Sequence, residues 1–533
     1  MPMQTTAFSR RAFLRFLSAS AVSAALPSSL SAASQPKRPN ILIMLADDMG
    51  FSDIGCYGSE INTPNLNALA ANGIRFTQFY NNARCCPTRA SLLTGLYPHQ
   101  TGVGHMIDNK NHPSYQGYLN DSCVTVAEAL QPANYHPLMV GKWHVGENRP
   151  HWPTDRGFER YYGLISGASN YFAIDEGRTF VDQDQSIDPA KAANFYMTDA
   201  FSTRALQLID EYAPKPDPFF MYLAYTSPHW PLHAHPDDIA KYRGKYLKGW
   251  DQLREERRQR MIDLGIIDKS TPLTPRDPKA PAWSTLSQKQ KEDLDVKMAI
   301  YAAQIDRMDQ NIGRVIAKLK ETNQFDNTLI LFLADNGGCA EPVNRGQPNA
   351  VPGTRESFAS YGLPWANASN TPFRLYKHWV HEGGISSPLI AHWPGHIQPN
   401  TMTAEPSHLI DLMPTCLELA NATYPQQRKG KAITPVEGRS IVPTLQGKPR
   451  KPHDAIFWEH EGNRAVRQGN FKLVSTANNK WELYNISIDR AELNNLAQSD
   501  PAKIKELSAL YDQWAKRCNV VPWNQLNKKK DPA

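Results

Sequence analysis

One segment of the sequence places a thiol, a proline and an arginine in an order suited to anion chemistry. Pro87 suits the first turn of a helix and Gly95 its end, so we expect Cys85 to lie just ahead of a helix N-terminus. Free backbone N–H groups and the helix dipole favour anions there. Arg89, four residues beyond Cys85, can share its helix face. A lone cysteine before a helix is more often a packed thiol than a nucleophile, so neighbouring motifs must decide.

Two acidic or amide pairs directly follow apolar runs. Asp47-Asp48 follows residues 40–46, and Asp335-Asn336 follows residues 329–334. Oxygen ligands without histidine or cysteine suit a hard cation such as calcium, and magnesium accepts similar ligands. Either pair alone would more often cap a turn. Two pairs at strand ends of one sheet favour a metal site, because concentrated negative charge needs a cation.

Two histidines and two lysines lie in polar segments that could join this site. Lys142 and His144 are close in sequence, His229 follows the apolar run 219–224, and Lys377 lies after the second acidic pair. Histidine can give and take a proton near neutral pH. Arginine and lysine can stabilise an anionic ester without acting as nucleophiles. These residues are therefore candidates for acid–base catalysis and anion binding.

The three apolar runs, residues 40–46, 219–224 and 329–334, have the pattern of strands buried on both faces of an α/β sheet. Ligands bind such sheets at the carboxyl ends of the strands, so the polar segments are expected to converge. Apolar residues spaced three and four apart over 298–319 predict a long helix packed on the sheet. Residues 233–283, rich in charge and proline, indicate an insertion with a helix near 250–264.

The pattern changes after a polar stretch at residues 424–441. Four short strand-like segments at 455–460, 464–467, 471–476 and 481–484 precede a helix at about 501–517. We therefore predict a catalytic domain at 38–430 and a small C-terminal α+β subdomain at 431–533, with one antiparallel sheet and one helix.

The N-terminus has the features of a twin-arginine export signal. Arg10-Arg11 precedes a small, apolar stretch at 16–26 and a small-residue site near Ala33. That stretch is too short to span a bilayer, so we expect a cleaved signal at 1–33 and no stable membrane span afterwards. The formal charge of +6 includes the arginines of the signal and gives no argument for a nucleic-acid partner. Cys85-Cys86 lacks zinc-ligand spacing.

The motifs together resemble those of the type I sulfatases, and most closely those of bacterial arylsulfatases. The resemblance rests on the Cys-x-Pro-x-Arg segment at Cys85 with its downstream Leu-Leu-Thr-Gly, and it extends over nearly the whole mature chain through ordered matches at Asp47-Asp48, Thr63-Pro64-Asn65-Leu66, Gly141-Lys142-Trp143-His144, Ser227-Pro228-His229, Asp335-Asn336-Gly337-Gly338, Leu375-Tyr376-Lys377 and Glu482-Leu483-Tyr484-Asn485. It implies an alkaline phosphatase-like fold, with a large mixed β-sheet sandwiched between helices. It also implies that Cys85 is oxidised to formylglycine by a formylglycine-generating or sulfatase-maturing enzyme.

The resemblance further implies the site residues and their roles. One calcium ion would be held by Asp47, Asp48, modified Cys85, Asp335 and Asn336. Arg89 would hold the formylglycine diol, and Asp335 would help activate it. His229, supported by Lys377, would protonate the leaving oxygen. His144 would accept a proton as sulfate departs, and Lys142 would stabilise the negative charge of the sulfate group.

The expected activity is hydrolysis of an aryl sulfate or a sulfated carbohydrate to an alcohol and inorganic sulfate. The Tat export machinery is the expected partner in export, and the periplasm or the outside the expected location. Two other functions stay open at this stage. A phosphoesterase or phosphonate monoester hydrolase would use a similar metal site, and a catalytically silent protein would only bind sulfated glycans.

Overall fold

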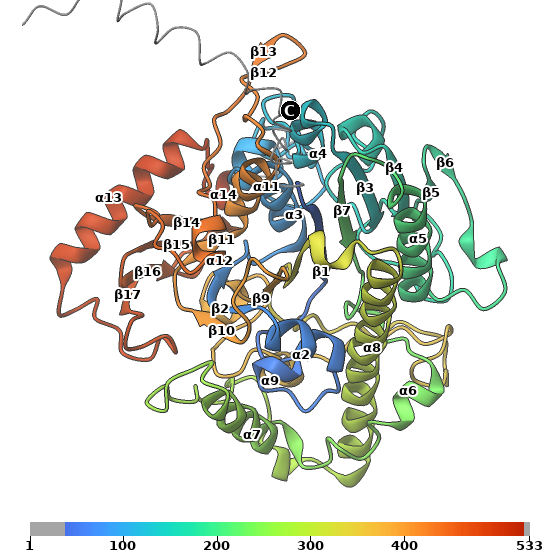
Figure 1. Cartoon of the computed structure of the whole chain (residues 1–533). Coiled ribbons are helices and arrows are strands. Elements are labelled where there is room, and N and C mark those ends of the chain that lie inside the picture. Colours follow the sequence, from blue (N-terminus) through green and yellow to red (C-terminus); the bar gives the residue numbers. More distant parts are fainter. Residues whose placement is uncertain (1–37, 527–533) are drawn as a thin grey trace, which may run out of the picture. The chain divides into compact units, whose positions relative to one another are not determined.

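The computed structural model describes residues 38–526, whose centre is a mixed eleven-stranded sheet (Figure 1). Its order is β10 (Thr401–Thr403), β2 (Ile74–Tyr80), β9 (Ser386–His392), β8 (Thr328–Ala334), β1 (Asn40–Ala46), β7 (Phe219–Ala224), β3 (His136–Gly141), β4 (Arg160–Leu164), β5 (Phe180–Asp182) and β6 (Gln185–Ser186), and β11 (Ser407–His408) pairs with β2. The predicted signal at 1–33 and the end of the chain from 527 lie outside the described residues.

The middle of the sheet is parallel. β8, β1, β7, β3 and β4 pair in parallel in that order, while β9 is antiparallel to both β8 and β2. Every residue of β1, β7 and β8 is buried, which explains their continuous apolar sequences. These are the three strands that the sequence predicts, so the predicted α/β class with a mixed sheet is confirmed.

Helices cover both faces of this sheet. Side chains alternate along β1: Leu42 and Met44 join one core, and Ile41 and Ile43 join the other. The first core includes α2 (Pro64–Ala71), α5 (Met197–Tyr212) and α8 (Gln288–Glu321), and the second includes α3 (Cys85–Thr94), α4 (Val126–Leu130) and α11 (Leu412–Ala420). The helix predicted at 298–319 is the buried part of α8.

The insertion at 233–283 contains α6 (Pro236–Ala240) and α7 (Gly249–Asp263), and α7 confirms the helix predicted near 250–264. Buried Arg257 on α7 pairs with Asp53 at 2.6 Å and with Glu60 at 2.9 Å, which ties the insertion to the loop after β1. Within residues 38–526, no helix combines the length and the apolar character that a membrane crossing requires.

The C-terminal part forms a second, antiparallel sheet of β14 (Ile456–His460), β15 (Asn463–Gln468), β16 (Phe471–Ser475) and β17 (Glu482–Asn485). α13 (Pro501–Arg517) packs on it through Leu507, Tyr511 and Trp514 (Figure 1). The predicted small sheet and the helix packed on it are therefore confirmed, but this part also contains two four-residue helices that were not predicted, α12 (Val442–Leu445) and α14 (Trp523–Leu526). The domain boundary at 430/431 stays a prediction.

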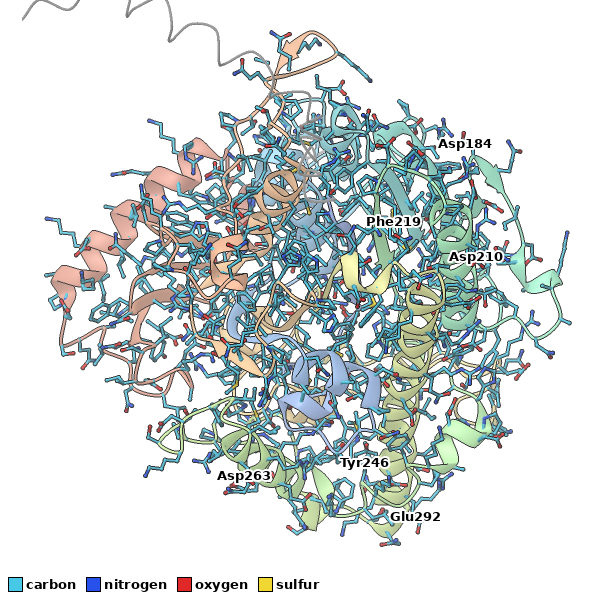
Figure 2. All side chains as sticks on the ribbon, in the orientation of Figure 1. Asp184, Asp210, Phe219, Tyr246, Asp263 and Glu292 are labelled. Carbon is cyan, nitrogen blue, oxygen red and sulfur yellow. The ribbon has the colours of Figure 1, made fainter. Side chains whose placement is uncertain are left out.

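Side chains fill the space between the sheet and its helices (Figure 2). Phe219, at the start of β7, lies in this interior, and Tyr246 is also fully buried. Asp184, Asp210 and Glu292 are exposed. Polar groups that are buried at the centre of the sheet differ from these exposed carboxylates, because without water they need hydrogen-bond partners or a ligand.

Candidate active site

The predicted site segments meet at one edge of the large sheet. Asp47-Asp48 follows β1, Lys142 follows β3 and Asp335-Asn336 follows β8. β1 and β3 each pair in parallel with β7, and β8 pairs in parallel with β1, so the carboxyl ends of these strands share an edge. Gly141 provides the turn after β3: its φ is 110°, and a Cβ there would lie 1.9 Å from the Ala224 carbonyl oxygen.

Helix α3 brings Cys85 to this edge. The helix begins at Cys85 itself, with Arg84 as its N-cap, so the prediction that Cys85 lies just ahead of the helix was wrong by one residue. The extended backbone of Arg84 starts the helix earlier than Pro87 suggested. Gly95 ends it in the left-handed conformation (φ 71°), as predicted. Thr88 fixes the helix to the edge by donating its hydroxyl to the Asp335 carbonyl oxygen at 2.7 Å.

Cys85 is buried beside a second thiol and an imidazole. The ligand atoms of Cys85, Cys86 and His144 all lie within 4.8 Å of one another. The Cys86 thiol donates to the Cys85 sulfur, and Lys142 and His144 lie nearby. Together they outweigh burial and hold the pKa of Cys85 well below its ordinary value. The surroundings therefore stabilise negative charge at the Cys85 side-chain position.

The first half of the charged cluster joins Asp47 to two cations. Lys142 Nζ lies 2.6 Å from Asp47 Oδ2, and the Arg89 guanidinium lies 3.7 Å from the same oxygen. Arg89 also donates to Asp335 Oδ2 at 2.9 Å. The side chains of all four residues are fully buried. Arg89 also donates to the Lys142 carbonyl oxygen at 3.0 Å, which fixes its guanidinium in place. Two carboxylates and two cations thus share one water-free space.

The second half is centred on Asp48. Lys377 Nζ donates to Asp48 Oδ2 at 2.8 Å, and the Asn336 amide donates to Asp48 Oδ1 at 2.7 Å. His229 Nε2 lies 3.3 Å from Asp48 Oδ2 and 3.4 Å from Lys377 Nζ. Burial alone would raise the pKa of Asp48, but His229 and Lys377 lower it below its usual range. The two halves meet where the Asp48 backbone N–H donates to Asp335 Oδ1 at 3.1 Å.

Two oxygens of this cluster have no partner among the described residues. Asp47 Oδ1 and Asn336 Oδ1 are buried and accept no hydrogen bond. Burial raises the pKa of Asp47, and burial next to Asp47 raises that of Asp335 well above its ordinary value. Buried oxygens without donors are costly unless something binds them. The residues present therefore fit a hard cation held by oxygen ligands.

Each catalytic histidine candidate is held in one orientation. His229 Nδ1 donates to the Trp230 carbonyl oxygen at 2.6 Å, which leaves Nε2 unprotonated and facing Lys377. His144 lies against Gly167, where a Cβ would come 2.3 Å from His144 Nε2. Burial lowers the pKa of each imidazole to about 4. Both rings are therefore neutral in this structure and ready to accept a proton.

Backbone strain is concentrated around these residues. Asp48 (φ 63°), Ala83 (φ 60°), His144 (φ 58°), Leu375 (φ 64°) and His378 (φ 90°) all have left-handed conformations that non-glycine residues seldom adopt. Such conformations cost on the order of 1–3 kcal/mol each and persist where the surroundings impose them. Their positions next to the predicted site segments are typical of an active site.

The structure brings all of the predicted site residues together. Sequence reasoning missed Arg84, which pairs with Glu341 at 2.8 Å, and Trp230, whose indole donates to the same carboxylate at 2.9 Å. It also missed Gly167. Arg84 and Trp230 directly adjoin Cys85 and His229, so their positions in the sequence were a usable signal. Nothing in the sequence signalled Gly167, because its contact with His144 depends on the fold.

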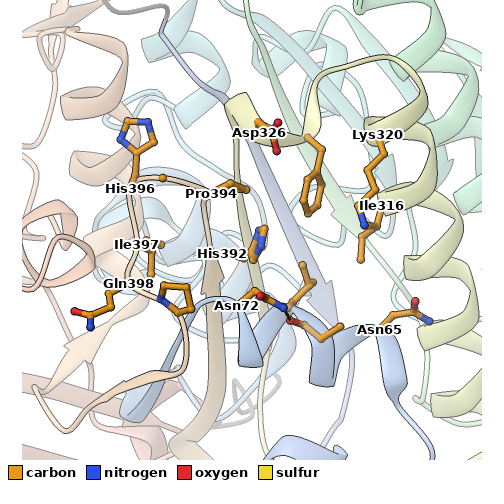
Figure 3. A pocket seen from close by; sticks show the side chains of 15 residues that line it. Asn65, Asn72, Ile316, Lys320, Asp326, His392, Pro394, His396, Ile397 and Gln398 are labelled. Atoms are coloured by element: carbon orange, nitrogen blue, oxygen red, sulfur yellow. Dashed lines mark hydrogen bonds between the residues drawn. The ribbon is translucent and has the colours of Figure 1, made fainter.

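A separate cavity of about 800 Å³ lies away from these residues (Figure 3). Its lining includes His392, Lys320 and Asn65. His392 ends β9, which runs antiparallel to β8, so the cavity opens near the amino ends of the parallel strands. None of the predicted site residues lines it.

Comparisons with known proteins agree with this geometry. Residues 39–422 match the family described as Sulfatase, and residues 373–516 match the C-terminal region of N-sulphoglucosamine sulphohydrolase. An uncharacterized sulfatase of Schizosaccharomyces pombe is 36% identical over 89% of this chain and 92% of its own length. An arylsulfatase of Klebsiella aerogenes is 34% identical over 78% of this chain and 94% of its own.

The crystal structure of Ps i-CgsB in complex with k-i-k-neocarrahexaose superposes with a TM-score of 0.68 at 26% identity, covering 90% of this chain and 93% of that one.

The fold and the site define an α/β enzyme of the alkaline phosphatase-like superfamily. Within that class, the chain belongs to the sulfatase family, whose members hydrolyse sulfate esters.

Proposed function

We propose that this protein hydrolyses sulfate esters through a formylglycine made from Cys85, with one calcium ion bound beside it. The observation that carries the proposal is the buried cluster around the start of α3. It combines cations that fit an anionic ester with the unpartnered oxygens of Asp47 and Asn336. Asp47, Asp48, Asp335, Asn336 and the modified Cys85 side chain would hold the ion. The bound groups would supply a hydroxyl nucleophile and a divalent positive charge.

The chain's own cations would bind and orient the sulfate group. Lys142 and Lys377 are each paired with one carboxylate at 2.6–2.8 Å and are nearly inaccessible to water. In such a site an ammonium group stabilises developing charge far better than in water. Arg89 lies 2.9 Å from Asp335 Oδ2 and 3.7 Å from Asp47 Oδ2, and we assign it to holding the side chain at position 85 in place.

Proton transfer would be divided between the two histidines. Lys377 Nζ donates toward the unprotonated His229 Nε2, so this pair can deliver a proton to the leaving ester oxygen. His144 is neutral and lies within reach of the Cys85 side chain, so it can accept the proton that is released as sulfate departs. The two imidazoles are on opposite halves of the cluster, which suits an acid and a base that act at different steps.

The substrate is proposed to be an aryl sulfate or a sulfated carbohydrate. The relative from Klebsiella aerogenes is named an arylsulfatase, and Ps i-CgsB is described in complex with k-i-k-neocarrahexaose. Half-buried Trp230, next to His229, offers an aromatic surface against which a ring could lie.

Peptide mass spectrometry across residue 85, on protein from its natural host, is the direct test, paired with an assay of sulfate release. The aldehyde mass at residue 85, with loss of activity in Cys85→Ala, is the expected outcome. An unmodified thiol in fully active protein would refute the formylglycine proposal. Matched aryl sulfate and phosphate esters distinguish a sulfatase from a phosphoesterase by their relative kcat/KM.

The proton-donor role has its own readout. In His229→Ala, kcat/KM should fall more for sulfates with poor leaving groups than for 4-nitrophenyl sulfate, because a good leaving group needs less protonation. His233→Ala is a suitable control, since His233 is buried and its Nε2 bonds the Ser357 carbonyl oxygen at 2.6 Å. Equal losses for all leaving groups in His229→Ala would contradict the role.

We further propose that residues 1–33 export the protein by the twin-arginine route to the periplasm or beyond. The support is the Arg10-Arg11 pair and the short apolar stretch that follows it. Changing both arginines to lysine should retain the protein in the cytoplasm. Unchanged export of this variant would contradict the proposal.

A further inference from the structure

A second cluster of titratable side chains lies outside the catalytic network. His105 comes from the loop after α3, while His460 and Glu461 come from the end of β14 and its turn. His378, the neighbour of Lys377, lies beside them, with His378 Nδ1 3.2 Å from Glu461 Oε2. Neither the sulfatase chemistry nor the calcium site uses His105, His460 or Glu461.

The cluster brings two imidazoles to one carboxylate. His105 Nε2 lies 2.6 Å from Glu461 Oε1, and His460 Nε2 lies 3.7 Å from the same oxygen. The ligand atoms of His105, His460 and Glu461 are all within 4.8 Å of one another. Side-chain adjustments would be needed to bring the three ligand atoms to the distances of a bound metal.

His460 is the unusual member of this group. Its side chain is fully buried, and neither ring nitrogen has a hydrogen-bond partner anywhere in residues 38–526. A buried imidazole that faces a carboxylate with an unused nitrogen lone pair requires an explanation beyond packing.

We propose that His105, His460 and Glu461 bind a divalent transition metal, with zinc as the natural ion. Two histidines and one carboxylate form a ligand set that zinc accepts, with a fourth position open to water. Nitrogen ligands separate this site from the oxygen-lined calcium site, because calcium and magnesium prefer oxygen alone. The two sites would therefore hold different metals in one chain.

Neighbouring groups support the ligands as outer partners do in metal sites. Asp108 Oδ1 lies 3.1 Å from His105 Nδ1, so that nitrogen can donate to Asp108 while a metal takes the place of the proton between His105 Nε2 and Glu461. The Asn463 amide donates to His378 Nε2 at 3.2 Å, and its oxygen accepts from the Ala477 N–H, which fixes the amide. His378 therefore donates through Nδ1 to Glu461 and orients the carboxylate without being a ligand.

The metal would join two parts of the chain. His105 belongs to the loop after α3, and His460 and Glu461 belong to the small C-terminal sheet, about 356 residues away in sequence. Glu461 also has a left-handed backbone (φ 52°), which aims its side chain back toward His105. A zinc ion there would fix the small sheet to the loop after α3 that carries His105.

Cobalt(II) is a suitable probe, because its visible absorption reports nitrogen ligands and a low coordination number. Purified full-length protein, stripped of metal and then saturated with calcium, is titrated with Co²⁺ and then with Zn²⁺. About one Co²⁺ per chain should bind with intense visible bands, and Zn²⁺ should abolish them. Co²⁺ should also quench Trp523, whose ring centroid lies 4.6 Å from that of His105.

Variants locate the site and separate it from the catalytic one. His460→Ala and Glu461→Gln should each weaken Co²⁺ binding by more than about 100-fold, and Asp108→Asn by about 10-fold. Asn336→Ala and His396→Ala should retain the bands, because Asn336 serves the calcium site and His396 is exposed and distant. Circular dichroism confirms that each variant is folded. Absence of the bands in wild-type protein, or their survival in both His460→Ala and Glu461→Gln, would overturn the proposal.

Discussion

Two buried charge clusters in this protein contrast sharply in how their polar atoms are paired. At the catalytic edge, Asp47 and Asn336 each keep one oxygen without a partner. Where the small sheet meets the large one, Glu382 bonds through both oxygens: Oε1 accepts from Lys472 at 3.0 Å, and Oε2 from Ser386 at 2.9 Å. Arg490 adds a further contact to Oε2 at 3.1 Å.

This difference distinguishes a binding site from a structural joint. A buried charge without a full set of partners is costly, so it persists where a ligand completes it. The Glu382 carboxylate has a donor for each oxygen, so it needs no ligand and can hold two elements in one arrangement. Glu382 and Lys472 are both completely buried, yet the interface cluster gives no reason to expect a bound ion. Burial of charge alone therefore does not identify an active site; what sets the catalytic edge apart from the Glu382 carboxylate is that Asp47 and Asn336 each keep an oxygen without a donor.

The largest expected effect is removal of the cation from the catalytic edge. Exhaustive chelation should lower kcat/KM by roughly 10³-fold, because the divalent charge contributes several kcal/mol to the transition state. The Tm should fall as well, since Asp47, Asp48 and Asp335 are left with insufficient positive charge. Added Ca²⁺ should restore both, and Mg²⁺ should do so less well. Full activity in protein shown to be metal-free would contradict the calcium proposal.

Glu382→Gln should weaken the contact between the small sheet and the large one and leave the active site unchanged. It leaves Lys472 buried with fewer negative partners, so we expect a loss of roughly 3–5 kcal/mol in the free energy of unfolding. Activity at 25 °C should stay near wild type as long as the protein is folded. Urea titration measures the change, and Glu506→Gln is the matched control on the exposed face of α13. A loss below about 1 kcal/mol would show that the joint is not stabilising.

Lowering the pH should gradually remove the contribution of ionised Glu382 to the free energy of unfolding. Burial opposes ionisation of Glu382, but Lys472, Arg490 and Arg467 lower its folded pKa to about 2, against an ordinary value of 4.5. A depressed pKa stabilises the fold fully above pH 4.5, and this stabilisation is lost as the pH falls toward 2. The gap in unfolding free energy between wild type and Glu382→Gln, about 3 kcal/mol from the two pKa values, should narrow over that range. A gap independent of pH would contradict the assignment.

Gly167→Ala should have the smallest effect on the protein, and it tests the catalytic cluster rather than the interface cluster. The new methyl group would meet His144 Nε2 at 2.3 Å and displace the ring. A displacement of about 1 Å should lower kcat by roughly 10- to 100-fold. Because His144 is assigned to sulfate release, rapid-mixing experiments should show a first turnover that is less affected than later ones. Gly447→Ala is the control: nothing lies within 4 Å of its Cβ, so its φ of 69° adds local backbone strain but no contact with His144.

Much of this site could be predicted because its signals are local. Runs such as 40–46 specify buried strands, and the geometry of a parallel sheet then brings Asp47, Lys142 and Asp335 to one edge. The four strands and the helix of the C-terminal part were likewise predicted from alternation and turns. In these cases neighbouring residues determine the structure, and the topology follows from general rules.

Other features depend on contacts that no local pattern reports. The contact between Gly167 and His144 requires the loop after β4 to approach the turn after β3. The pairing of His105 with Glu461 joins segments hundreds of residues apart. The start of α3 at Cys85 was missed because the backbone of Arg84, rather than Pro87, sets it. Tertiary packing decides each of these details, so one sequence could not supply them.

The burial of α3 also determines when the proposed modification can take place. All ten residues of the helix are buried, and Cys85 has 2% of its surface exposed. A modifying enzyme cannot reach this thiol in the folded chain, so oxidation competes with folding for each newly made molecule. Once a molecule has folded, its state at residue 85 is permanent. The specific activity of a preparation would then depend on the rate of oxidation at residue 85 relative to the rate of folding. Slower folding should yield a larger active fraction from the same gene.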